Sequence, residues 1–222
     1  MTISALRTDP TLDEIREAIA PLLATHAAFD GWNDRAVASA GGDLGVDAEI
    51  AQLAMKGGTM VLIDAWIGSI DAEMARRLPP EKLAAMKIRE RITALVSTRL
   101  NIIAPDKEGQ RRALAIMAMP QNMPATARIG WRSADRMWRL AGDTATDFNH
   151  YTKRITLSAV YASTLAVFAN DDGDGYTETR AFLDRRIDNV MQFEKWKFAT
   201  KARTENLPSL SRFVGRLRYP PR

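Results

Sequence analysis

WRSADRMWRLAGDTATDFNHYTKR, the stretch from Trp131 to Arg154, indicates two helices that meet at a break. Gly142 interrupts the helical pattern near its centre. Before the break, apolar residues spaced at i, i+3 and i+4 form one helical face that includes Trp138. Met137 and Leu140 lie off that face, and we therefore expect them to point outward. Such a mixture of large aromatic and charged side chains favours recognition of a partner or ligand.

A second interpretation of the same stretch requires only helix ends. Gly142 would end the first helix, residues Asp143 to Asp147 would cap the next, and the tryptophans would be ordinary core residues. Capping does not explain why Met137, Leu140, His150 and Tyr151 occur together. Both interpretations therefore stay open.

The composition limits the chemistry of the chain. It has 222 residues, no Gly/Ser-rich linker and no cysteine, which predicts one main domain plus a tail and excludes disulfides and thiolate catalysis. His26 and His150 lie far apart, without the ligand spacing of a zinc or di-iron site. The acidic loop Asn170 to Gly175 resembles a calcium loop, but Ala181 occupies the position of the required glutamate. We expect no enzyme, no metal and no cofactor.

Targeting signals are also missing from the sequence. No apolar run reaches the 18 or so residues that span a bilayer, and the N-terminus lacks the apolar core of a signal peptide. We therefore expect a cytoplasmic protein without a signal or targeting peptide.

Helical periodicity runs through the chain and predicts an all-α fold. Thr11 and Glu14 fit a capping box for a first helix. Two short helices with a glycine turn at residues 41–45 follow, in a helix-turn-helix outline. A long central helix then ends at Pro79-Pro80, where the next helix starts. We divide the chain into a helix-turn-helix part (1–56), a helical body of the same compact domain (57–195) and a tail (196–222).

The tail carries most of the positive charge. From Lys195 onward eight Lys or Arg face one acid, a balance of +7, so residues 1–194 carry about −3. Residues 195–206 read as a basic tether, and an amphipathic helix follows. Its predicted membrane-binding residues are Leu210, Arg212, Phe213, Val214, Arg216, Leu217 and Arg218. Apolar residues with cations around them favour an anionic membrane surface. The alternative is that this helix packs on the body or on another copy.

The order from Met137 to Arg154 closely resembles the signature of the ninth Coq protein family of ubiquinone biosynthesis. The resemblance extends from about Leu12 to Glu194, through Gly57-Gly58-Thr59 and the segment Phe182 to Met191. It implies a fold like that of TetR regulators. It also implies a non-catalytic accessory protein that binds lipid and assists the demethoxyubiquinone hydroxylase. Together with the basic tail and the expected cytoplasmic location, this predicts a peripheral protein at the inner face of the cytoplasmic membrane.

The resemblance further implies two sites. One is a pocket for an isoprenoid or quinone-like lipid between the body helices, for which we propose Met60, Ile63, Trp66, Ile67, Ile70, Met86, Leu95, Met117, Trp131, Trp138, Leu157 and Tyr161. The other is a hydroxylase-docking surface formed by Met137, Leu140, Gly142, Asp143, Asp147, His150, Tyr151 and Arg154. His150 departs from the family motif, which can carry an aromatic residue there.

A TetR-type DNA-binding regulator with an apolar ligand pocket is the alternative function. The candidate reading helix, Asp47 to Lys56, has two acids before its single lysine. Negative charge there repels phosphates, so we expect DNA binding to be absent. A homodimer is compatible with the sequence.

Overall fold

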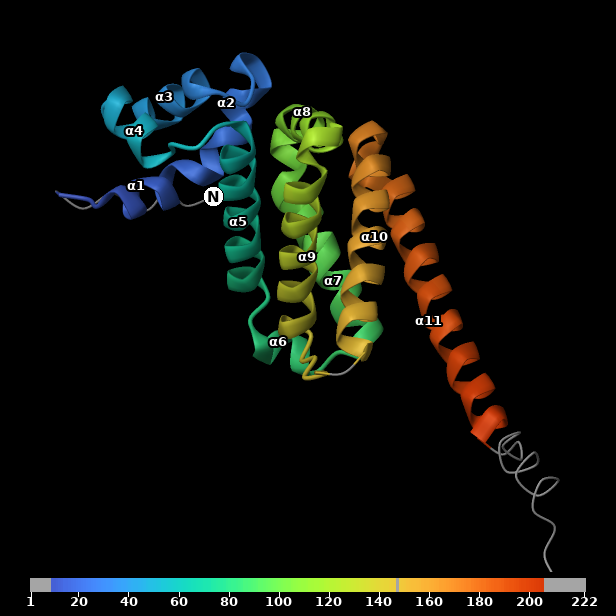
Figure 1. Ribbon diagram of the computed structural model, residues 1–222. Coiled ribbons are helices and arrows are strands. Elements are labelled where there is room, and N and C mark those ends of the chain that lie inside the picture. Colours follow the sequence, from blue (N-terminus) through green and yellow to red (C-terminus); the bar gives the residue numbers. More distant parts are fainter. Residues whose placement is uncertain (1–8, 147, 206–222) are drawn as a thin grey trace, which may run out of the picture.

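The computed structural model describes residues 9–146 and 148–205, with side chains as far as Gln192. Over these residues all regular structure is helical, which confirms the all-α prediction (Figure 1). The α-helices are α1 Leu12–Ile19, α2 Leu23–Asp30, α3 Asp34–Gly42, α4 Ala48–Ala54, α5 Thr59–Arg77, α6 Pro80–Ala84, α7 Ile88–Ile103, α8 Lys107–Met117, α9 Met123–Leu140, α10 Phe148–Asn170 and α11 Thr177–Glu205. Short 3-10 turns link several of them, at Ala20–Leu22, Ala104–Asp106, Pro120–Asn122 and Asp174–Tyr176.

Helices α1 to α4 form the N-terminal part at one end of the molecule (Figure 1). The predicted capping box starts α1: the Glu14 amide donates to Thr11 Oγ1 at 3.3 Å, and the Thr11 amide donates to Glu14 Oε2 at 2.8 Å. Asp47 caps α4 by accepting from the amides of Glu49 and Ile50. The α3–α4 pair therefore has the expected helix-turn-helix outline.

In the body, α9 lies between α5 and α10, α7 contacts α5, α9 and α10, α8 packs mainly on α2, and α11 lies on the outer side of α10 (Figure 1). Most of the large apolar residues of α5 are buried because helices contact it on several sides; they are Leu62, Ile63, Trp66, Ile67, Ile70 and Met74. This helix is therefore the centre of the core, as its wide apolar arc predicts.

One expected helix is divided in two. The helix that starts at Pro80 ends at Ala84, and α7 begins only at Ile88. Lys87 has an extended backbone, and its amide donates to Glu90 Oε2 at 2.9 Å, which caps a new helix there. A local N-cap at Lys87 thus starts a separate helix after the short one that begins at Pro80.

The C-terminal helix is longer than expected. The backbone of α11 stays helical to Glu205, so most of the segment interpreted as a basic tether is helical. The predicted membrane-binding residues, Leu210 to Arg218, lie outside the described residues. Among the described helices no single one is long and apolar enough to span a bilayer; α4 and α5 pass that test only together, bent by 83°.

Candidate functional site

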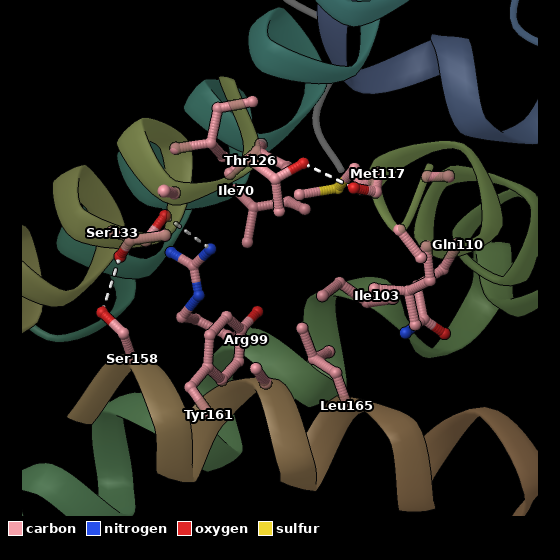
Figure 2. A pocket seen from close by; sticks show the side chains of 18 of the residues that line it. Ile70, Arg99, Ile103, Gln110, Met117, Thr126, Ser133, Ser158, Tyr161 and Leu165 are labelled. Carbon is pink, nitrogen blue, oxygen red and sulfur yellow. Dashed lines mark hydrogen bonds between the residues drawn. The ribbon is translucent and has the colours of Figure 1, made fainter. Parts of the chain in front are cut away.

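A cavity of about 520 Å³ lies between α5, α7, α8, α9 and α10 (Figure 2). Its wall is mostly apolar. The lining residues are Trp66, Ile67, Ile70, Arg99, Ile103, Gln110, Ala113, Leu114, Met117, Ala118, Met123, Thr126, Ala127, Ile129, Gly130, Ser133, Ile155, Ser158, Ala159, Tyr161, Ala162 and Leu165. Each surrounding helix contributes the part of its apolar face that no neighbouring helix covers.

Five of the twelve residues predicted for a lipid pocket line this cavity: Trp66, Ile67, Ile70, Met117 and Tyr161. The other seven do not. Ile63, Leu95 and Leu157 are buried in the core, and Met60 and Met86 pack against it. Trp131 and Trp138 lie beside the start of α10 instead: the Trp131 ring is 5.9 Å from the Tyr151 ring, and Trp138 Nε1 donates to the Lys153 carbonyl at 3.0 Å. Residues that line the cavity and residues that are packed in the core can thus be distinguished only in the three-dimensional structure.

One side of the cavity holds a buried ion pair. Arg99 on α7 donates to the Asp71 carboxylate on α5, and both side chains are at most 4% exposed. Ser133 Oγ accepts from Arg99 Nη2 at 3.3 Å (Figure 2) and also donates to Asp71 Oδ2 at 3.3 Å. Because the opposite charges are adjacent, this wall is polar but carries no net charge.

The Tyr161 ring packs against the Arg99 guanidinium of this ion pair. The Arg99 guanidinium carbon lies 4.8 Å from the centre of the Tyr161 ring. Burial raises the pKa of the Tyr161 phenol, and the nearby Arg99 only partly opposes this. The phenol is therefore a neutral hydroxyl at the cavity wall.

The mouth of the cavity is apolar and faces solvent. Met123 on α9 is 53% exposed and Ile155 on α10 is 61% exposed, and both line the cavity. Phe148 (73% exposed) and Tyr151 (56%) precede Ile155 by seven and four residues on α10, so the three share one helical face. We call Phe148, Tyr151 and Ile155 the aromatic patch. It runs from the first turn of α10 to the mouth of the cavity.

The turn before α10 is fixed by helix ends and buried charges. Gly142 has φ +88°, and the Asp143 amide donates to the Trp138 carbonyl at 2.9 Å, which ends α9 as predicted. Asp143 accepts from Lys153 at 2.6 Å and from Arg154 at 3.0 Å. Burial alone would raise the pKa of the Asp143 carboxyl, but these hydrogen bonds outweigh it and hold the pKa below its usual value. The carboxylate therefore locks the turn onto α10.

The structure corrects the predicted docking surface. Met137 is fully buried, because α9 packs on α5, α7 and α10 and so buries a wide arc. The side chains of Asp143 and Arg154 are at most 4% exposed, so they hold the turn together rather than face a partner. Leu140 also packs against the core. Asp147 lies outside the described residues.

The outer part of the predicted surface is Gly142, His150 and Tyr151. His150 Nδ1 lies 2.9 Å from the Ala145 carbonyl, and its ring packs edge-on against Tyr151 at 5.2 Å. Sequence reasoning missed the two exposed apolar residues that flank Tyr151, namely Phe148 and Ile155. Their spacing of three and four residues from Tyr151 was the available signal.

The helix in the DNA-reading position, α4, exposes apolar rather than cationic side chains: Ile50 is 46% and Leu53 56% exposed. Glu49 stands in its first turn. Such a surface lacks the cations that neutralise phosphates.

The carboxylates of the acidic loop before α11 have partners within the protein: Asp171 accepts from Thr179, and Asp172 pairs with Lys107. Over the described residues, no three His, Asp or Glu side chains gather as a metal site.

Comparison with known proteins gives a consistent result. A family model described as COQ9 matches residues 123–194. Human "Ubiquinone biosynthesis protein COQ9, mitochondrial" is 31% identical over 168 residues, covering 72% of this chain and 52% of the human protein. The rat protein of the same name is 32% identical, with 72% and 54% covered. The chain thus spans about half the length of these relatives.

Among solved structures, a TetR transcriptional regulator from Nitrosomonas europaea superposes with a TM-score of 0.62 at 18% identity, covering 82% of this chain and 98% of that one. This likeness shows a shared, TetR-like fold. The matched segment and the mammalian relatives place the chain in the COQ9 family of ubiquinone biosynthesis proteins.

Proposed function

We propose that this protein is a non-catalytic accessory protein that binds an isoprenoid or quinone-like lipid in the cavity and presents it to the demethoxyubiquinone hydroxylase. The observation that carries the proposal is the position of Ile155, which belongs both to the cavity mouth and to the aromatic patch. A lipid that leaves the mouth therefore emerges beside the surface proposed to dock the enzyme.

The cavity suits an apolar ligand. Its volume of about 520 Å³ falls within the roughly 300–1,000 Å³ of small-molecule sites. Met117 and Met123 lie in the wall, and flexible thioether side chains adapt to ligands of varied shape. The exposed mouth residues are apolar as well, so an aliphatic chain extending through the opening would still contact apolar surface.

The aromatic patch suits a protein partner. Buried aromatic anchors supply most of the binding energy of typical interfaces, and Phe148 and Tyr151 are exposed aromatic residues one helical turn apart. The ion pairs of Asp143 with Lys153 and Arg154 fix the first turns of α10, so the patch is held in one orientation before a partner arrives. Pre-ordering of this kind lowers the entropy cost of binding.

The tail supports a membrane-bound site of action. Its sequence carries seven more positive than negative charges from Lys195 onward, and Leu210, Phe213, Val214 and Leu217 have helical spacing. Each cation near an anionic surface contributes about 1 kcal/mol, so we propose weak, reversible binding to the inner face of the cytoplasmic membrane. Lipid extraction from the bilayer would then occur close to the hydroxylase.

The lipid proposal predicts that gently purified protein carries a stoichiometric isoprenoid or quinone lipid. Mass spectrometry of the native protein and of its organic extract measures this. Ala162→Trp places an indole at the mouth of the cavity and should reduce the recovered lipid at least about 10-fold, because the ring occupies the entrance. Ala162 is exposed, so the folded state should tolerate the ring.

The matched control is Ala166→Trp, one turn further along α10, which is also exposed but does not line the cavity. It should retain the lipid. Lipid-free, well-folded wild-type protein, or equal lipid loss in both variants, would contradict the proposal.

The docking proposal predicts that Tyr151→Ala and Phe148→Ala each weaken binding to the hydroxylase about 10-fold or more, because each removes an aromatic anchor. Titration of the purified hydroxylase by biolayer interferometry gives the dissociation constants. Phe29→Ala serves as the control, since Phe29 is 85% exposed on α2, in the N-terminal part and away from the patch. Unchanged affinity in both patch variants would refute this assignment.

A further inference from the structure

Gln110 on α8 has a buried side-chain amide without a partner. The residue is 2% exposed, and neither its Nε2 nor its Oε1 makes a hydrogen bond to any described residue. A buried polar group left unpaired costs about 1–3 kcal/mol, and most such groups in proteins are satisfied. The amide lines the cavity, beside Ile103 (Figure 2).

The backbone of α8 holds Gln110 in this position. At the preceding residue, Gly109, helix α8 comes so close to α2 that an added Cβ would lie 2.1 Å from the Ala24 carbonyl oxygen. Trp32 Nε1 donates to the Gly109 carbonyl at 3.0 Å and fixes the register. Gln110 shares its helical face with Ala113, Leu114 and Met117, whose side chains offer no strong hydrogen-bonding group. Its amide is therefore available to a ligand.

The charge balance of the cavity selects the kind of ligand. Among the described residues that line it, Arg99 is the one that carries a charge, and the Asp71 carboxylate already neutralises the guanidinium. An anionic head group would find no free counter-ion and would be repelled by Asp71. Figure 2 shows Arg99 and Ser133 on one side of the cavity and Gln110 on another, with apolar side chains between them.

We propose that Gln110 binds the head group of the lipid and selects a neutral head group that carries carbonyl or hydroxyl oxygens. Nε2 donates to a carbonyl oxygen, and Oε1 accepts from a hydroxyl. This inference rests on the proposed lipid-binding function and adds the residue and the head-group chemistry that give it specificity. The apolar chain then extends along the methionine and isoleucine wall toward the mouth.

The test compares Gln110→Leu with the wild type, using calorimetric titration with three probes: a benzoquinone with a decyl chain, decylbenzene and dodecanoate. The variant should bind the quinone about 10-fold more weakly, because the hydrogen bonds are lost. It should bind decylbenzene equally or more tightly. Without ligand the variant should also have a higher Tm, since an unpaired polar group has been removed.

Gln52→Leu, the same substitution at an exposed residue of α4 that does not line the cavity, is the matched control and should bind the quinone as the wild type does. Equal loss of quinone and decylbenzene in Gln110→Leu, or unchanged quinone affinity, would overturn the role of Gln110. Tighter wild-type binding of dodecanoate than of the quinone would overturn the neutral head group. If the wild type binds none of the three probes, the proposed lipid function fails together with this inference.

Discussion

Asp71→Ala is expected to lower the free energy of unfolding by about 3–5 kcal/mol, because it leaves the Arg99 guanidinium buried and without its counter-ion. Arg99 is 1% exposed, so water does not replace the lost carboxylate. Ser133 also loses its acceptor, Asp71 Oδ2. Arg132 Nε lies 3.8 Å from Asp71 Oδ2, but Arg132 also pairs with Asp64 at 2.6 Å and should not add to the loss.

Urea denaturation followed by circular dichroism measures this change. The double variant Asp71→Leu with Arg99→Met should recover most of the loss, since apolar residues can replace a buried ion pair at little cost. Asp64→Ala is the less buried counterpart: its pair with Arg132 has side chains 30% and 44% exposed and should contribute at most about 1 kcal/mol. A loss below about 1 kcal/mol in Asp71→Ala would show that the pair is not buried as described.

Gly109→Ala should destabilise the protein by about 3 kcal/mol, at the upper end of typical overpacking penalties. Most overpacked sites relax by moving a side chain, but here the methyl group would meet the backbone of Ala24 at 2.1 Å. Relief requires α8 to move away from α2, which also breaks the hydrogen bond from Trp32 to the Gly109 carbonyl.

Thermal unfolding with Gly68→Ala as the control isolates this effect. Gly68 is also helical, in α5, and a Cβ there meets nothing within 4 Å. Alanine at this position should raise stability by up to about 1 kcal/mol through helix propensity. Similar behaviour of the two variants would mean that the α2–α8 contact is loose.

The helices were predictable because their signals are local. Caps such as Thr11, breaks such as Pro79 and Gly142, and stripes of apolar residues fix where helices start, end and bury a face. The prediction for Met137 was wrong because one stripe does not show how many neighbours a helix has. Helix α9 packs on several helices, so residues beside the stripe are buried too.

The cavity was only partly predictable because packed and unpacked apolar positions look alike in sequence. Ile63 and Ile67 lie one turn apart on α5 and are both buried, yet Ile67 lines the cavity and Ile63 does not. The polar residues were a better, unused signal. Arg99 and Gln110 interrupt apolar faces of α7 and α8, and interruptions of that kind need a partner inside the fold.

The Trp32 indole couples the N-terminal helices to the wall of the cavity. It contacts the Trp66 ring at 5.3 Å, and Trp66 lines the cavity, while its Nε1 holds α8. The N-terminal helices therefore share their anchoring with the cavity wall and should unfold together with it. By thermodynamic linkage, a lipid in the cavity then protects α3 against local opening as well, although α3 contributes no residue to the cavity lining.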